Sequence, residues 1–383
     1  MKNILKIVFV IIGTLIGAGF ASGKEIYIFF FSYGEKGIFA IIISSILMGI
    51  IIYDVLKIIH KKEIKTYKEF LEEITNNSKN VTIKNRKINK NIKSENIKIK
   101  DIKNTNTKNK EIANKQTKSL INTIINLFIL ISFYIMIAGF GAYCNQQFGI
   151  KPIIGSITLA ILTYVIISKN IKGVVLLNQI IVPILIAFII LIGSLNILEL
   201  DLINISDYIT QTNYTNWLMS GILYSSYNAI LLIPVLITLR KYIKNEKQIS
   251  KISIIIMAIV IILSLSIYGI LIRVDVNIQN LEMPAAYVIS NTYPYLKIPY
   301  AIILLASILT TAVSLGNSFI ENTAKSEKKK RWIRKLICIT AILVSGIGFS
   351  NLVNNMYPIF GYLGLIQILA IIIKAKKCVH FWK

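Results

Sequence analysis

The stretch GTLIGAGFASGKE, residues 13–25, holds the residues with the most evident chemical potential in this chain. Apolar sequence stands before and after it, so it lies inside a segment long enough to cross a bilayer. Small residues cover every face of such a helix, and that density favours an unwound backbone over packing against one neighbour. The residues that we predict as a binding segment are Gly17, Ala18, Gly19, Phe20, Ala21, Ser22 and Gly23.

An unwound stretch inside a membrane helix has two kinds of free backbone group. Its carbonyl oxygens can bind a cation, and the N–H groups that begin the next half-helix can bind an anion such as a carboxylate. These groups are costly in lipid unless they line a cavity or meet protein partners. Gly13 and Gly17 also form a G-x-x-x-G pair, so close packing of helices stays open as the alternative.

Hydroxyl groups on a later apolar segment, 298–321, have a spacing that suits cation binding. Ser307, Thr310 and Thr311 stand at i, i+3 and i+4, so a helix places their oxygens on one face. Hard cations prefer oxygen ligands of this kind. The alternative is that each hydroxyl bonds to a carbonyl of its own helix.

The elements that carry these residues are apolar blocks, each long enough to span the hydrocarbon core. With 55% apolar residues and a mean hydropathy of +0.65, the chain is predicted to be an all-α polytopic membrane protein. Five blocks lie in 4–196 and five in 215–374, which indicates two repeats of opposite orientation. The ten expected spans are 4–32, 37–56, 120–143, 152–168, 174–196, 215–239, 252–272, 298–321, 333–350 and 355–373.

The sixth block, 215–239, corresponds to the first in this arrangement and has an unusually polar centre. A broken helix in one repeat often has a counterpart in the other, so we predict a second interruption there. The second part of the binding site is then expected on Tyr224, Ser225, Ser226, Tyr227 and Asn228.

The net charge of +25 follows membrane topology and does not indicate a nucleic-acid surface. With both termini in the cytoplasm, 38 lysines and arginines lie inside and 5 outside, in agreement with the positive-inside rule. We therefore expect the lipid bilayer as a partner and no nucleic acid. Residues 76–118 are almost entirely Asn, Lys, Ile, Thr and Ser, and are predicted to be a disordered cytoplasmic insertion.

Signals of catalysis are few. The three cysteines and two histidines are scattered, and no Walker, H-E-x-x-H or G-x-S-x-G sequence occurs. We predict that the chain is not an enzyme and holds no cofactor beyond a coupling ion. Lys24 and Glu25 follow the binding segment, and we expect them to form an outer gate or to lie in water.

On these residues the chain resembles a known group. GTLIGAGFASGKEI in the first block and SYNAILLIPVL in the sixth resemble the YkvI-type bacterial membrane proteins, usually described as amino-acid permeases. The pattern of ten blocks resembles the LeuT-type 5+5 inverted repeat of the amino acid–polyamine–organocation superfamily. Only the first signature is specific, and the rest of the resemblance is architectural.

The resemblance implies a secondary transporter of the bacterial plasma (inner) membrane. Its substrate would be an amino acid or a related small zwitterion, carried by alternating access with sodium or a proton as the coupling ion. A permease-like sensor that binds the ligand without transport is the alternative. The identity of the substrate, the direction of transport and the oligomeric state stay open.

The resemblance also implies roles for single residues. A side chain from the third span, for which Tyr134 is the candidate, would close one wall of the substrate site. A sodium site would join carbonyls of the first span to hydroxyls of the eighth, with the ligands Gly13, Ile16, Ser307, Thr310 and Thr311.

Overall fold

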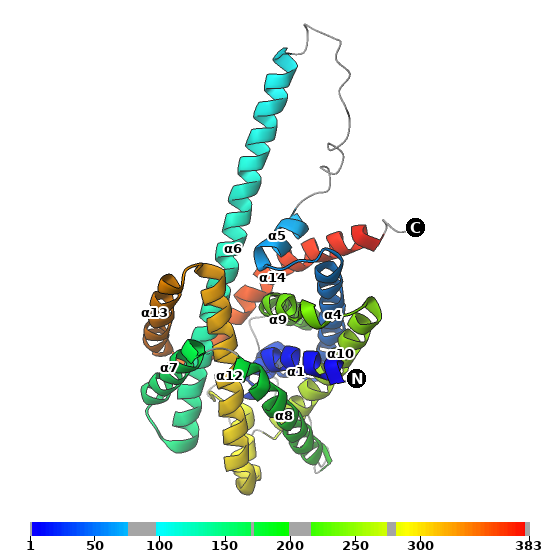
Figure 1. The fold of residues 1–383 in the computed structure, drawn as a ribbon. Helices are drawn as coiled ribbons and strands as arrows, with labels where there is room; N and C mark the ends of the chain where they lie inside the picture. The colour runs from blue at the N-terminus through cyan, green and yellow to red at the C-terminus, as the bar shows by residue number, and fades with distance from the viewer. Residues whose placement is uncertain (1, 76–96, 170–171, 199–215, 274–280, 380–383) are drawn as a thin grey trace.

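The computed structural model describes residues 2–75, 97–169, 172–198, 216–273 and 281–379. Every regular element among these residues is a helix (Figure 1). The α-helices are α1 (Lys2–Leu15), α2 (Ala18–Ala21), α3 (Lys24–Phe29), α4 (Glu35–Lys61), α5 (Tyr67–Thr75), α6 (Ile97–Phe148), α7 (Pro152–Lys169), α8 (Lys172–Leu198), α9 (Trp217–Leu239), α10 (Glu246–Leu271), α11 (Pro284–Thr292), α12 (Lys297–Thr323), α13 (Glu327–Ser345) and α14 (Phe349–Val379).

Eight of these helices are long and apolar enough to cross a membrane, where ten spans were expected. The first expected span, 4–32, is divided among α1, α2 and α3, and its longest apolar piece is Asn3–Leu15. The ninth, 333–350, falls largely in α13, which begins with the charged run EKKKRWIRK and has too many charges to qualify. Exposed isoleucines such as Ile180, Ile254 and Ile302 lie on the outer faces of the spans, where lipid would cover them.

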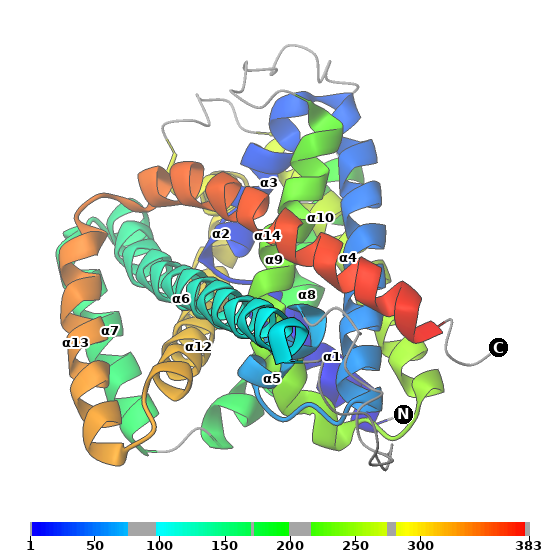
Figure 2. The same ribbon diagram turned by 90° about the horizontal axis from the view of Figure 1, so that it is seen from above.

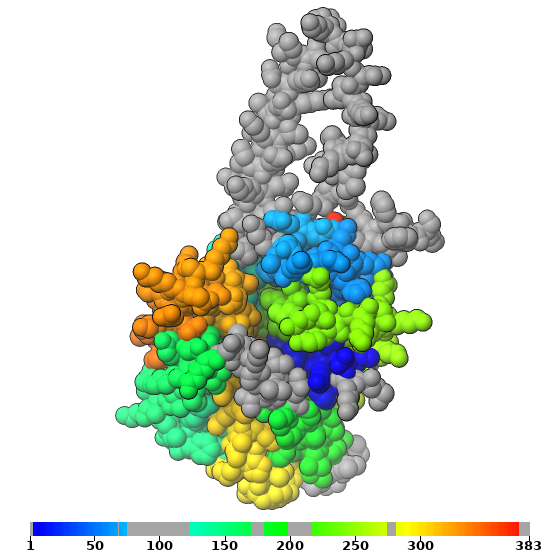
Figure 3. Space-filling view, in the orientation of Figure 1, coloured from blue at the N-terminus to red at the C-terminus, as the bar shows by residue number. Residues whose placement is uncertain are grey.

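The first three helices lie in the middle of the bundle. α1 packs against α8, α9, α10 and α12, and α3 packs against α9, α10 and α14. Figure 2 shows α1 and α3 among the long helices α4, α9 and α10. On one flank, α13 lies beside α7, as the space-filling view also shows (Figure 3). The segment predicted to carry the binding site is therefore enclosed by the longer helices.

The interruption expected in the sixth block is absent, because α9 runs unbroken from Trp217 to Leu239. Three of its polar side chains are satisfied within the helix itself. Ser225 Oγ donates to the Gly221 carbonyl at 2.7 Å, and Ser226 Oγ donates to the Ile222 carbonyl at 2.6 Å. Asn228 Nδ2 donates to the Tyr224 carbonyl at 3.0 Å. Side chains that bond back in this way make a polar membrane helix possible without unwinding, and sequence polarity alone does not separate the two cases.

The helix α6 also differs from expectation. It begins at Ile97 and projects from the bundle, so residues 97–118 are helical although disorder was predicted there (Figure 1). Once a membrane-spanning helix is formed, each added residue extends an existing hydrogen-bond ladder at little cost. Residues 76–96 of the same tract lie outside the described residues.

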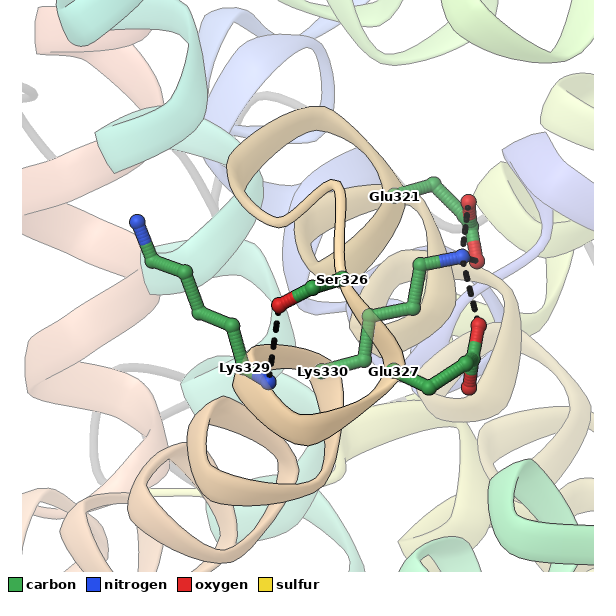
Figure 4. Close-up of polar contacts among 5 residues, drawn as sticks. All are labelled: Glu321, Ser326, Glu327, Lys329 and Lys330. Atoms are coloured by element: carbon green, nitrogen blue, oxygen red, sulfur yellow. Dashed lines mark hydrogen bonds and ion pairs between the residues drawn. The ribbon is translucent and has the colours of Figure 1, made fainter.

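The junction of α12 and α13 shows how the basic flanks are anchored (Figure 4). Lys330 Nζ pairs with Glu321 at 2.7 Å and with Glu327 at 3.4 Å, and Ser326 Oγ accepts the N–H of Lys329 at the start of α13. The hydrogen bond that Lys330 donates to the Glu321 carboxylate is the main cause that raises the pKa of the Lys330 ammonium. These contacts fix the sharp turn that precedes α13.

Small residues set the closest helix crossings. At the crossing of α8 and α10, a Cβ atom on Gly193 would lie 2.5 Å from Ser266 Cβ and 2.6 Å from Ser266 Cα. At the crossing of α6 and α7, a Cβ on Gly155 would lie 2.8 Å from the Cα of Gly141. Backbone atoms approach this closely only where one partner lacks a side chain.

We expect Gly193→Ala to lower the free energy of unfolding by about 1–3 kcal/mol, because the added methyl must force α8 away from α10. The measurement is the melting temperature of the purified protein in detergent. Gly346→Ala is the matched control, since its Cβ would meet only the Leu343 carbonyl at 3.3 Å. Equal melting temperatures for the two variants would contradict the tight crossing.

Candidate functional site

The backbone leaves the helical path directly after Leu15, where α1 ends. Gly17 is extended, with φ −91° and ψ −168°, and α2 begins at the next residue. The N–H of Gly17 donates to the Leu15 carbonyl at 3.0 Å, so it does not bond the Gly13 carbonyl as it would in a continuous helix. The Gly13 carbonyl is thereby free to take a partner from another helix.

A second kink separates α2 from α3. Gly23 has φ +82°, a left-handed conformation that favours glycine, and a Cβ there would also lie 3.1 Å from Ala285 Cβ. The Ser22 carbonyl accepts the N–H of Ala285 at 2.8 Å, at the start of α11. Tyr300 of α12 donates its hydroxyl to the Ala21 carbonyl at 2.6 Å. Carbonyls released by the kink are therefore bonded by the helices around it.

Hydroxyl groups of α12 meet the carbonyls at the first break. Ser307 Oγ donates to the Ile16 carbonyl at 2.9 Å, and Thr311 Oγ1 donates to the Gly13 carbonyl at 3.3 Å. Both side chains are buried. Four of the five residues predicted as sodium ligands therefore lie together. Thr310 is the exception, because its hydroxyl donates to the Ser307 carbonyl of its own helix at 3.0 Å.

Glu25 occupies the break itself, whereas the sequence predicted that it would form an outer gate or lie in water. The side chain extends from α3 back over Gly19, so that a Cβ on Gly19 would collide with the Glu25 carboxyl group. That carboxyl accepts a hydrogen bond from the Tyr227 hydroxyl of α9, and the Tyr357 hydroxyl of α14 and the Phe20 N–H of α2 lie close to it. Glu25 as a whole is only 3% exposed.

Lys24 points elsewhere. Its Nζ donates to the Leu281 carbonyl at 2.8 Å, and its electrostatic partner is Glu282. The two residues expected to form one gate are thus directed to different surroundings, since adjacent residues of a helix point about 100° apart.

Aromatic rings surround the carboxyl group of Glu25. The Tyr227 ring stacks on Tyr357 with centroids 4.8 Å apart and on Phe29 with centroids 5.4 Å apart. Tyr224 meets Tyr227 edge to face at 5.5 Å. Tyr224 and Tyr227 were expected at the site. Tyr357 was missed, because nothing in the tenth span distinguished it from Tyr362 in the same largely apolar run.

Tyr134, the residue predicted to close one wall of the substrate site, faces α13 in the structure. Its hydroxyl shares a hydrogen bond of 2.7 Å with Thr340 Oγ1 on α13, away from the break. Met136 and Gly139 of α6 face the break instead. Met136 Sδ accepts the N–H of Ala18 at 3.3 Å, and a Cβ on Gly139 would lie 2.8 Å from Ala18 Cβ. Positions two apart lie about 200° around a helix, so Tyr134 and Met136 face opposite sides.

We expect Tyr227→Phe to lower the free energy of unfolding by about 1–3 kcal/mol, because it removes a hydroxyl that donates to a buried carboxyl group. Thermal unfolding in detergent measures the change. Tyr143→Phe is the matched control, since the buried Tyr143 hydroxyl has no hydrogen-bond partner among the described residues. A loss of stability in the control that equals the loss in Tyr227→Phe would show that the Glu25 contact contributes nothing.

No family model matches the chain. The uncharacterized membrane protein YkvI of Bacillus subtilis (strain 168) is 26% identical over 374 residues, covering 96% of this chain and 95% of that protein. The protein YyaD of the same strain is 22% identical over 379 residues, with 96% of each chain covered. Among solved structures, a Na⁺-coupled sialic acid symporter has a TM-score of 0.51 at 14% identity, covering 94% of this chain and 75% of that one. These likenesses show a multi-pass membrane protein with the LeuT-like helical fold.

Proposed function

We propose that this chain is a secondary transporter that moves an amino acid or a related small zwitterion by alternating access. The observation that carries the proposal is the meeting of the α12 hydroxyls with the carbonyls released where α1 ends. Ser307 and Thr311 bond the carbonyls of Ile16 and Gly13 at 2.9 and 3.3 Å. The function is transport and not catalysis.

Four neutral oxygens converge at this point, two from carbonyls and two from hydroxyls. Such a set matches the preference of a hard monovalent cation for oxygen ligands. Each hydroxyl now uses only its proton, which it donates to a carbonyl. The lone pairs of the hydroxyl oxygen are unused, so rotation of the hydroxyl can turn them toward an ion. We therefore assign sodium as the first candidate for the coupling ion and a proton as the second.

The substrate site is proposed at the break from Gly17 to Gly23. Backbone groups there are bonded by residues of α6, α11 and α12. Movement of any of these helices therefore changes which backbone groups of the break are available to a ligand. The solved structure that shares this fold is that of a Na⁺-coupled sialic acid symporter, which supports transport as the general activity.

The proposed topology has ten crossings, with both termini in the cytoplasm of a bacterial plasma membrane. The pieces α1, α2 and α3 together form the first crossing and α13 forms the ninth. This arrangement restores two five-span repeats around the break, the architecture in which one bundle of helices rocks against the other.

The decisive experiment is uptake by proteoliposomes of radiolabelled amino acids, with an inward gradient of sodium or of choline. We expect uptake that requires sodium. Ser307→Ala and Thr311→Val should each raise the sodium concentration for half-maximal uptake at least about tenfold, the equivalent of about 1.4 kcal/mol.

Thr310→Val is the matched control, because its hydroxyl bonds within α12, and its sodium dependence should match that of the wild type. An equal effect in all three variants would contradict the assigned ligands. Uptake indifferent to sodium would move the coupling role to protons. Ligand-dependent thermal stabilisation without any uptake would identify a permease-like sensor instead.

A further inference from the structure

The beginning of α13 carries a dense group of positive charges. Residues 325–335 hold seven lysines and arginines but a single glutamate. Four of the basic residues line a pocket of about 490 Å³ together with Ser326 and Trp332; these four are Lys328, Lys329, Arg331 and Lys335. The proposed sodium and substrate sites, which lie at the break of the first span, do not use this basic pocket.

The acidic side chains beside the basic pocket are already paired. Glu321 and Glu327 both contact Lys330 Nζ, at 2.7 and 3.4 Å. Figure 4 shows Lys329 directed away from these carboxylates. Within the part of the chain that the structure describes, the four basic residues of the pocket make no ion pair. Their charges therefore suit an anion from outside the chain.

An apolar groove of about 260 Å³ lies between α7 and α13 and shares Lys335 with the basic pocket. Ile161 and Tyr164 line it from α7, and Ile339 and Ile342 line it from α13. Ile161 is 57% exposed and Ile339 is 60% exposed. The groove thus opens on an outer face of the bundle, where the hydrocarbon of a bilayer would cover it.

One face of α13 joins the pocket to the groove. Along this face the residues follow one another at intervals of four, three, four and three positions; they are Lys328, Trp332, Lys335, Ile339 and Ile342. At about 100° per residue, this spacing keeps all five within a narrow stripe along the helix. The stripe begins with basic residues and ends with isoleucines, which is the order of an anionic headgroup and an acyl chain.

Two further contacts support a site at the level of the headgroups. Trp332 is 63% exposed, and tryptophan concentrates at membrane–water interfaces because its ring is apolar and its N–H is polar. Arg334 donates to Ser168 Oγ at 2.9 Å, which ties the start of α13 to the end of α7. The two walls of the groove are therefore held together at its basic end.

We propose that this surface binds one anionic phospholipid. Its phosphate lies in the basic pocket, and one acyl chain lies in the groove between α7 and α13. Basic pockets between spans bind anionic headgroups because each lysine or arginine near the surface adds electrostatic attraction. An acidic protein or a nucleic acid would meet the charges but leave the apolar groove unfilled. The inference uses the proposed crossing of the membrane by α13, and it does not depend on what the protein transports.

The test titrates the purified full chain in neutral detergent with phosphatidylglycerol, and in parallel with phosphatidylcholine of the same chains. Native mass spectrometry measures the Kd of the first lipid bound. Both lipids contain a phosphate, but only phosphatidylglycerol has a net negative charge. We expect phosphatidylglycerol to bind at least about tenfold more tightly than phosphatidylcholine.

The double variant Lys328→Gln/Lys335→Gln removes two charges from the stripe. We expect it to weaken binding of phosphatidylglycerol about 30-fold, because each charge near the headgroup contributes separately. Lys247→Gln/Lys251→Gln is the matched control. It removes two exposed lysines at the start of α10 that line neither the pocket nor the groove, and it should bind as the wild type does.

Ile339→Trp fills the groove without changing any charge. We expect it to weaken binding of phosphatidylglycerol about tenfold, because the acyl chain loses its place against α7. Leu343→Trp is its control, since Leu343 is 74% exposed on the same helix and does not line the groove. Melting temperatures equal to that of the wild type show that the variants are folded.

Three results would overturn the inference. They are equal affinity for the two lipids, equal binding by the two double-lysine variants, and equal binding by Ile339→Trp and Leu343→Trp. Displacement of the lipid by inorganic phosphate at equal concentration would also overturn it, because the pocket would then be a site for a free anion. None of these results bears on the proposed transporter, whereas a failure of uptake in proteoliposomes leaves the lipid site intact.

Discussion

The need to satisfy backbone groups in a medium without water governs this structure. Where α1 ends at Leu15, the carbonyls of Gly13 and Ile16 lose their helical partners and must find others within the protein. Ser307 and Thr311 of α12 provide them. The break therefore exists only because a second helix with correctly spaced hydroxyls lies beside it, and the same oxygens that satisfy the backbone are suited to a cation.

The helices around the break share this task unequally. α6 offers a soft sulfur atom to the N–H of Ala18, α11 bonds the Ser22 carbonyl, and α9 directs the Tyr227 hydroxyl to Glu25. Each contact joins a different part of the bundle to a segment of about ten residues. A shift of one helix relative to another must change these bonds, which gives the proposed alternating access a physical basis at the break.

The two charged residues that follow the break have separate roles in the structure. Lys24 is held by the segment that precedes α11, whereas Glu25 is held inside the bundle. The glycine at position 19 makes room for the Glu25 carboxyl, so the small residues of this stretch serve the protein's own acid as well as any ligand. Small residues in a membrane helix can thus mark a site for a side chain of the same chain.

The sequence by itself determined the coarse design. Apolar blocks predicted a multi-pass helical protein, as the eight spans and the membrane-protein relatives confirm. The density of small residues in 17–23 and the i, i+3, i+4 hydroxyls marked the segments that the fold brings together, because local composition limits the backbone and helical spacing defines a face. Only the tertiary structure decided which partners those faces meet. It directed Tyr134 to α13, kept α9 unbroken, separated Thr310 from Thr311 and turned Glu25 inward. The rotation of each helix about its own axis is set by packing against helices that are distant in the sequence. The sequence alone therefore does not reveal the rotation angle.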